Sequence, residues 1–254
     1  MEQKSTIIEI NTLSKEYSTA RGESFLAIDN INLKIQEHSF TCIVGPSGCG
    51  KSTILRIAAG LEKASSGTVH YNNAPVTKPC GEIGLVFQEY SLFPWLSVID
   101  NVAAGLEFSG MGKEERHEIA TRYIRMVNMI DFKDAYPHEL SGGMRQRVAI
   151  ARALANDPDV LLMDEPFGAL DAHTRILLQQ ELLKVWELTK KTIILVTHSV
   201  DEAIFLADNI LIMESKPGRI RKHLPVNISR PRSRGIPEFG EMTDHILREL
   251  EFSM

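Results

Sequence analysis

A glycine-rich loop between an apolar run and a helical run constrains the fold more than any other feature. The run "SFTCIV", residues 39–44, leads into "GPSGCG", and "KSTILRIAAGL" follows with apolar residues at helical spacing. This order matches the P-loop pattern of glycine, four residues, then Gly-Lys-Ser/Thr, between a strand and a helix. Because glycines let successive backbone N–H groups turn inward, and a helix presents its positive end, such a loop is suited to bind phosphate. The sequence therefore predicts a nucleotide-binding domain.

The predicted phosphate-binding residues form one continuous stretch. We expect Lys51 to reach the β- and γ-phosphates, and the Ser52 hydroxyl to bind Mg²⁺. The full set predicted for the loop is Gly45, Pro46, Ser47, Gly48, Cys49, Gly50, Lys51, Ser52 and Thr53.

Apolar strand patterns and helical patterns alternate in the second half of the chain. The runs "DVLLMDE", "TIILVTH" and "NILIMES" are typical of buried strands, whereas "AHTRILLQQELLKVWELT" and "VDEAIFLAD" have helical spacing. Such alternation indicates an α/β fold with a mainly parallel sheet, here a P-loop NTPase core. Two alternating stretches within residues 5–35 and a hairpin turning at Asn-Asn predict an antiparallel N-terminal β subdomain.

The helical patterns between the strands predict an inserted α-helical lobe. We expect one domain over residues 1–254, with a core lobe at 1–90 and 157–226, a helical lobe at 91–156 and a tail at 227–254. The tail begins with a Pro/Arg-rich connector, "SRPRSRG". An amphipathic helix with Ile246, Leu247 and Leu250 on one face is expected to follow it.

Polar residues follow several of the predicted strands. Asp164 and Glu165 end "VLLMDE", where a Walker-B aspartate would hold Mg²⁺ and a general base would activate water. His198 ends "TIILVTH" and can contact the γ-phosphate or orient water, and Gln88, predicted to end the strand "EIGLVFQ", can contact Mg²⁺ or the water. Because the carboxyl ends of parallel strands meet at one edge of a sheet, these side chains should converge on the phosphate site.

A second loop, "LSGGMRQR", also presents a helix start with uncovered amides. Ser141 is a suitable N-cap, and Gly142 and Gly143 leave the first backbone N–H groups accessible. The loop is equally typical of an ordinary capped helix. If it serves a phosphate, a second copy of the chain is the natural donor, since the loop lies in the predicted helical lobe.

Composition excludes some classes of function. The formal net charge is -5 and the sequence pI is about 5.9, which argues against a nucleic-acid partner held by a basic field. Three cysteines are too few for a disulfide framework. No apolar run reaches the ~18 residues of a membrane span, so a membrane role would require a partner.

The order of "GPSGCGKST", Gln88, "LSGGMRQR", "VLLMDE", "GALD" and His198 resembles the nucleotide-binding subunit of ATP-binding cassette (ABC) transporters over residues 6–225. The resemblance implies a homodimer that encloses two Mg-ATP, with Ser141, Gly142 and Gly143 acting in trans on the partner's γ-phosphate. It also implies that Asp171 lies at the dimer interface and that Tyr17 stacks on adenine. A structural role for Tyr17 at the end of a strand remains an alternative.

The same resemblance implies a membrane partner. The aromatic segment, residues 88–102, corresponds to the region that receives a coupling helix from a transmembrane permease, although its aromatics could instead pack between the lobes. A periplasmic or lipoprotein solute-binding protein would act indirectly, and the chain would lie peripherally at the cytoplasmic face of the membrane. The resemblance implies a transport-coupled ATPase, with Lys51, Glu165 and His198 as catalytic residues.

The branch of the family and its substrate are less constrained. The chain is most similar to importers of nitrate, sulfonates and taurine, which favours a small anion. Alternatives are import of another small organic solute such as a thiamine precursor, a soluble ABC ATPase outside transport, and a non-enzymatic nucleotide-regulated subunit.

Overall fold

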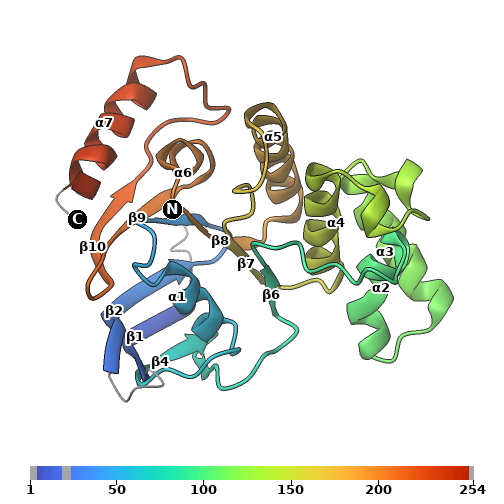
Figure 1. Cartoon of the computed structure of the whole chain (residues 1–254), viewed down its shortest axis with the longest axis horizontal. Helices are drawn as coiled ribbons and strands as arrows, with labels where there is room; N and C mark the ends of the chain where they lie inside the picture. The colour runs from blue at the N-terminus through green and yellow to red at the C-terminus, as the bar shows by residue number, and fades with distance from the viewer. Residues whose placement is uncertain (1–4, 19–23, 252–254) are drawn as a thin grey trace. The chain divides into compact units, whose positions relative to one another are not determined.

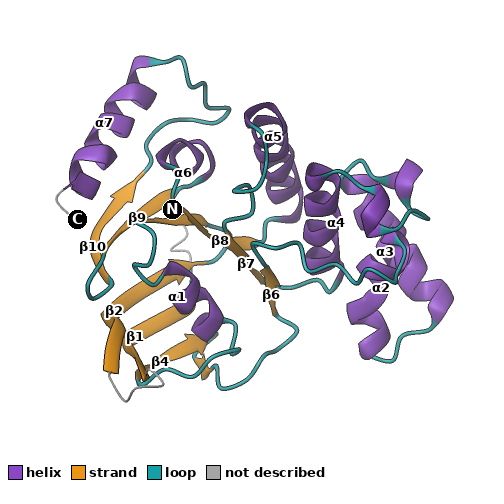
Figure 2. Cartoon of the chain, viewed as in Figure 1, coloured by secondary structure: helices purple, strands orange, loops and turns teal. Residues whose placement is uncertain are grey.

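The computed structural model describes residues 5–18 and 24–251, which group into two compact units. The first unit combines the described residues up to Cys80 with those from Thr192 onward, and the second spans Gly81–Lys191. Each unit contains strands and helices (Figure 2).

The first unit opens with an antiparallel sheet. It comprises β1 (Thr6–Ser18), β2 (Ser24–Gln36), β4 (Ser66–Tyr71) and β5 (Ala74–Pro75), in the order β2-β1-β4-β5. Asn72 and Asn73 join β4 to β5 with φ values of 46° and 64°. Two consecutive residues with positive φ form the turn that matches strand twist in a tight hairpin. The predicted N-terminal antiparallel subdomain and its Asn-Asn turn are therefore confirmed.

The first unit also contains a set of buried parallel strands. β3 (Phe40–Val44) pairs in parallel with β8 (Thr192–Thr197) and with β9 (Asn209–Glu214). Every residue of β3 and β8 is buried, as the continuous apolar runs predict. One further strand, β10 (Arg219–Pro225), pairs antiparallel with β9. The sequence pattern does not predict β10, because its charged residues and its neighbouring prolines are typical of a connector.

Helices α1 (Lys51–Ala58), α6 (Val200–Leu206) and α7 (Pro237–Glu251) complete this unit, with α6 and α7 packed against each other and α7 against β9 (Figure 1). Helix α7 confirms the predicted tail helix but not its whole apolar face. Its buried residues are Phe239 and Ile246, seven positions apart, whereas Leu247 is 45% exposed. Residues seven apart share a helix face, and the residue next to one of them is turned by about 100°.

The second unit consists of two parallel strands and several helices. β6 (Ile83–Val86) pairs with β7 (Val160–Asp164). α2 (Val98–Phe108), α3 (Lys113–Met126) and α4 (Gly142–Ala155) pack together, and α5 (Ala172–Thr189) packs against α4. Two 3₁₀ turns, η1 (Ile130–Phe132) and η2 (Pro137–Glu139), lie between α3 and α4. The predicted helical lobe, 91–156, lies within this unit, which also holds β6, β7 and α5. These strands and helices establish the predicted α/β fold class.

Candidate nucleotide-binding site

The glycine-rich loop joins β3 to α1 within the first unit. Gly50 is the N-cap of α1 and has φ of 94°, a left-handed conformation that strains any residue with a side chain. A Cβ atom there would also lie 2.2 Å from Ile28 Cγ2. The Lys51 ammonium is buried and donates to the carbonyl oxygens of Gly45 at 2.8 Å and Pro46 at 3.0 Å. The loop therefore holds a fixed cation next to the helix start, as a phosphate site requires.

Cys49 is a packing residue of this loop. Its side chain is fully buried, and a Cβ atom at Gly45 would lie 2.9 Å from its sulfur. Burial raises the pKa of the Cys49 thiol, although the neighbouring Lys51 charge opposes the rise. Because the thiolate is the reactive form, burial of the Cys49 thiol disfavours its reaction and favours a packing role.

Tyr17, predicted to stack on adenine, lies beside the helix that follows the loop. Its hydroxyl is 3.4 Å from Thr53 Oγ1, and the Lys15 ammonium lies 4.9 Å from the centre of its ring. Burial and a hydrogen bond with Glu62 raise the pKa of Tyr17. These contacts bring Tyr17 and the P-loop helix together, while its role towards adenine stays a prediction.

His198 follows β8 directly and is exposed. Its two neighbours are fixed: Thr197 Oγ1 donates to Glu202 Oε2 at 2.6 Å and accepts from the Ser199 N–H at 3.0 Å. The backbone at His198 is thereby attached to the start of α6, because Ser199 is the N-cap of that helix.

Asp164 and Glu165 lie at the end of β7 in the second unit. All five residues of β7 are buried, including Asp164. Glu165 has φ of 43°, and the Gly168 N–H closes a turn by donating to the Glu165 carbonyl oxygen at 3.1 Å. A glutamate held in the left-handed region costs about 1–3 kcal/mol, and such strain clusters at functional sites. The turn places two adjacent carboxylates at one strand end, as the sequence predicts.

Gln88 departs from its predicted position as the last residue of a strand. β6 ends at Val86, and Gln88 lies two residues beyond it, in an exposed bend. The apolar pattern overestimates the length of the strand. Phe87 continues the pattern, but it lies outside β6 and is 38% exposed.

The aromatic segment that follows Gln88 is organised by a residue that sequence reasoning missed. The Asn101 side chain is fully buried, accepts from the Phe93 N–H at 2.8 Å, and donates to three carbonyls. These carbonyls belong to Phe93, Leu96 and Ser97. A buried asparagine whose hydrogen bonds are all formed can hold a loop whose backbone makes no regular helix or sheet hydrogen bonds.

Arg152 of α4 fastens the same segment. Its guanidinium donates to the Ser91 carbonyl at 2.7 Å and to the Tyr90 carbonyl at 3.2 Å. Trp95 nevertheless stays 71% exposed. The aromatic segment therefore combines anchored backbone with an exposed Trp95 ring. The sequence signals its aromatic residues but not the side chains that anchor it.

The loop "LSGGMRQR" begins α4 as predicted. Ser141 is the N-cap, and its Oγ accepts from the Met144 N–H at 3.3 Å. A Cβ atom at Gly142 would lie 3.2 Å from Tyr90 Oη, and one at Gly143 would lie 2.6 Å from Thr174 Cγ2. The close approach of α5 thus explains why residue 143 has no side chain.

Asp171 lies next to the contact between Gly143 and Thr174 of α5. It is the N-cap of α5, and its Oδ1 accepts from the Thr174 N–H at 3.0 Å. That hydrogen bond lowers the pKa of Asp171. The structure therefore brings the Ser141–Gly143 loop and the Asp171 loop together within the second unit, through Thr174.

The residues predicted to hold Mg²⁺ are oxygen donors of the right kind. They are the Ser52 hydroxyl in the first turn of α1 and the Asp164 carboxylate, with the Gln88 amide as a third candidate. Within the described ranges, no group of three or more His, Cys, Asp or Glu side chains could hold a metal ion. This donor set suits Mg²⁺, which takes one or two protein ligands together with substrate phosphates and water.

No helix in the described part of the chain has both the length and the apolar character needed to cross a membrane.

The sequence and the fold of this chain are similar to those of known ATP-binding proteins. A family model described as ABC transporter matches residues 28–168. An uncharacterized ABC transporter ATP-binding protein of Methanocaldococcus jannaschii is 50% identical over 96% of this chain and 91% of its own length. A nitrate import ATP-binding protein of Synechocystis sp. is 45% identical, over 94% of this chain and 93% of its own. An aliphatic sulfonates import ATP-binding protein of Bacillus cereus is 44% identical, over 96% of each.

A solved structure is also similar to this chain. A dimeric ATP-binding cassette in a post-hydrolysis state, bound to ADP and Pi, superposes with a TM-score of 0.78 and 34% identity, covering 88% of this chain and 100% of that one. The family match exceeds half of the chain, and the relatives align along nearly their whole length. The chain therefore belongs to the ATP-binding proteins of the ABC transporter family.

Proposed function

We propose that this chain, an ATPase coupled to transport, drives the import of a small anion such as nitrate or an aliphatic sulfonate. One observation carries the proposal: relatives that are 45% and 44% identical, over more than nine-tenths of both chains, are nitrate and aliphatic sulfonates import ATP-binding proteins. Identity at this level along the whole length makes a shared role the simplest interpretation.

ATP would bind first at the P-loop. The Lys51 ammonium, which now donates to the Gly45 and Pro46 carbonyls, would turn to the β- and γ-phosphates. The amides at the start of α1 would add hydrogen bonds and the positive end of the helix dipole. Tyr17 would stack on the adenine ring.

Hydrolysis would follow by attack of water on the γ-phosphorus, in line with the bond to the leaving ADP. Glu165 would accept the proton of the attacking water on its carboxylate, and His198 would orient the water or donate to the γ-phosphate. Lys51 would stabilise the negative charge on the γ-phosphate oxygens. Ser52 and Asp164, with Gln88, would hold Mg²⁺, which neutralises phosphate charge when bound.

Two copies would be needed for efficient turnover. Ser141, Gly142 and Gly143 would donate to the γ-phosphate held by the partner copy, and Asp171 would lie at the interface. The position of Ser141 and Gly142 at the N-terminus of α4 supports this role, since helix N-termini bind anions. The dimeric state of the structurally similar cassette also supports it.

The membrane partner would be a permease docked on the aromatic segment, residues 88–102. The exposed Trp95 ring supports this placement, because interface cores are enriched in aromatic side chains. The chain would then be peripheral to the membrane at its cytoplasmic face, and a solute-binding protein would act through the permease.

The catalytic assignment is tested with Glu165→Gln. This variant should bind ATP as tightly as the wild type and lose turnover, because the amide keeps the shape of the side chain but cannot accept the proton. ATP binding by calorimetry and phosphate release by a coupled assay measure the two properties. Near-normal phosphate release would refute the assignment of Glu165 as the base.

The substrate is tested in the source organism. Deletion of the gene should prevent growth with nitrate as sole nitrogen source or with an aliphatic sulfonate as sole sulfur source. A wild-type copy should restore growth, and a Glu165→Gln copy should not. Normal growth of the deletion strain on both anions would refute the proposed substrate class.

A further inference from the structure

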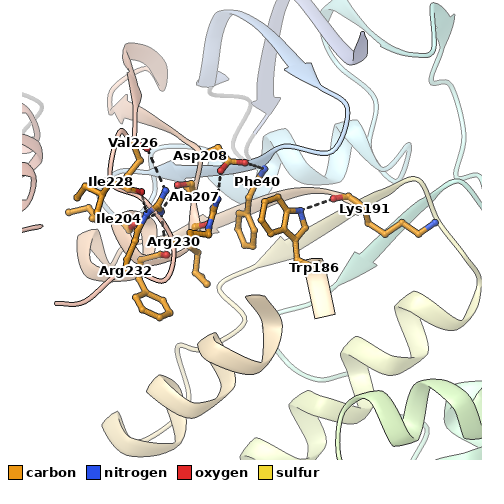
Figure 3. Close-up of polar contacts among 12 residues, drawn as sticks. Phe40, Trp186, Lys191, Ile204, Ala207, Asp208, Val226, Ile228, Arg230 and Arg232 are labelled. Atoms are coloured by element: carbon orange, nitrogen blue, oxygen red, sulfur yellow. Dashed lines mark hydrogen bonds and ion pairs between the residues drawn. The ribbon is translucent and has the colours of Figure 1, made fainter. Parts of the chain in front are cut away.

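The Pro/Arg-rich run "SRPRSRG" is more than a connector. Its three arginines, Arg230, Arg232 and Arg234, all contact α6 or the residues that follow it, and we name this set the arginine clamp. Figure 3 shows Arg230 and Arg232 turned toward the backbone at the end of α6. The clamp and α6 belong to the same unit.

The clamp satisfies the carboxyl end of α6. Arg232 is 6% exposed, and its guanidinium lies among backbone carbonyls. Its Nη1 donates to Ile204 at 2.6 Å, Phe205 at 3.3 Å and Ala207 at 2.6 Å, while Arg230 donates to the Leu206 carbonyl. The last four carbonyls of a helix have no partner within the helix, and cations are stabilising there. Arg230 and Arg232 thus supply hydrogen-bond donors to the carbonyls at the C-terminus of α6.

The clamp is also tied to the parallel strands. Arg230 forms an ion pair with Asp208, and the other carboxylate oxygen of Asp208 accepts from the Phe40 N–H at 2.9 Å. Phe40 begins β3, the strand that leads into the P-loop. Burial, with the Arg230 charge as a second cause, lowers the pKa of Arg232 to about 10, so the side chain stays charged at neutral pH.

Arg234 holds the opposite end of α6. Its Nε lies 2.8 Å from Asp201 Oδ1 and 2.9 Å from Oδ2, and its guanidinium carbon lies 4.1 Å from the centre of the Phe205 ring. Asp201 is in the first turn of α6 and Phe205 in the last. The clamp therefore spans the whole helix.

The helix held by the clamp begins two residues after His198, with Ser199 as its N-cap. Glu202 of α6 is buried, accepts from Thr197 Oγ1, and has its own N–H bound by Ser199 Oγ at 3.3 Å. Thr197 and Ser199 flank His198 in sequence. Any shift of α6 must therefore move the backbone at His198.

We propose that the arginine clamp is a positioning device for His198: by fixing α6 at both ends, the tail sets the place of the histidine during ATP hydrolysis. This inference rests on the proposed function, in which His198 acts on the γ-phosphate or its water. ATP binding belongs to the P-loop, so the clamp should affect turnover and not affinity.

The test compares clamp variants of the full-length chain at a temperature where circular dichroism shows each to be folded. Arg234→Met and Arg232→Met keep an apolar stem but remove the guanidinium. We expect kcat to fall about 10- to 100-fold, the range expected for misplacement by about 1 Å, with KM for ATP within about two-fold. Lys222→Met is the control, because it breaks an ion pair between β10 and Glu249 of α7 that involves no residue of α6.

A double-mutant cycle separates positioning from simple stabilisation. On a His198→Ala background, Arg234→Met should reduce kcat no further, because the clamp acts through the missing ring. If Arg232→Met does not fold, the charge exchange Asp201→Arg with Arg234→Asp replaces it: each single change should lower kcat, and the pair should recover it.

The possible failures are distinct. If His198→Ala retains normal kcat, the proposed role of His198 is wrong. If His198→Ala loses kcat while folded clamp variants match the wild type, or if the losses simply add in the double variant, the clamp does not position His198 and the inference is overturned.

Discussion

Substitution of Gly218 by alanine should weaken ATP binding, although residue 218 is far from the P-loop in sequence. Gly218 lies in the turn between β9 and β10, where its N–H donates to the Ala27 carbonyl at 3.0 Å and its carbonyl accepts from the Asp29 N–H at 2.9 Å. A Cβ atom at Gly218 would lie 2.0 Å from the carbonyl oxygen of Cys49, inside the P-loop. The clash is therefore with backbone, which no side-chain rotation can relieve.

The size of the effect follows from that distance. Ordinary van der Waals contact begins at 3.4 Å, so the Cys49 carbonyl would have to retreat by about 1.4 Å. The loop amides are part of the same backbone and would move with it. A hydrogen bond to a charged group is worth about 1.5–3 kcal/mol, so loss of one amide–phosphate hydrogen bond should raise the Kd for ATP roughly 10- to 100-fold. This is about 1.4–2.8 kcal/mol of binding free energy.

The assay is calorimetric titration of ATP into Gly218→Ala, with thermal unfolding measured in parallel. Overpacking should also lower the free energy of unfolding by about 1–3 kcal/mol, leaving the chain folded at low temperature. Gly240→Ala is the matched control, because a Cβ atom there meets no atom within 4 Å. A folded Gly218→Ala whose Kd stays within about two-fold of the wild type would refute the reasoning.

Two further predictions concern the second unit. Arg152→Met removes two charged hydrogen bonds to the carbonyls of residues 90 and 91, each worth about 1.5–3 kcal/mol, so amide hydrogen exchange over residues 88–96 should accelerate. Unchanged protection in mass-spectrometric exchange would contradict this anchoring role. Burial favours the neutral form of Asp100, yet hydrogen bonds with Ser97 and His117 hold its pKa below 3.8. Its stabilising effect is therefore complete above pH 3.8 and is lost as pH falls through the lowered value, so urea unfolding of Asp100→Asn should depend less on pH in that range than the wild type. Identical pH dependence of the two proteins would contradict the assignment.

The sequence predicts those parts of the molecule that depend on local pattern. Residues close together in sequence set the pattern of these parts. Examples are the continuous apolar runs of β3, β7 and β8, the helical spacing of α5 and the Asn-Asn turn. Family membership follows from the order of short motifs. Each motif consists of consecutive residues, such as Gly45–Thr53, and can therefore be recognised from the sequence.

The remaining features depend on contacts between residues distant in sequence. Arg232 reads as a solvated residue in a Pro/Arg-rich run, but it is buried because α6 leaves its last carbonyls unpaired 25 to 28 positions earlier. Asn101 lies on an otherwise apolar helix face, and only the loop around Phe93 shows what its amide binds. Gly218 reads as an ordinary turn glycine until the Cys49 carbonyl is found against it.

The central claim is that each ATP is hydrolysed between the P-loop of one copy and the Ser141–Gly143 loop of another. The most direct measurement mixes two inactive variants, Lys51→Ala and Gly142→Asp, and records ATP turnover. A head-to-tail dimer of one variant with the other restores one complete site, so a 1:1 mixture should recover up to about a quarter of wild-type activity. If the two loops act within one copy, every copy in the mixture is defective and turnover should stay at the level of the separate variants.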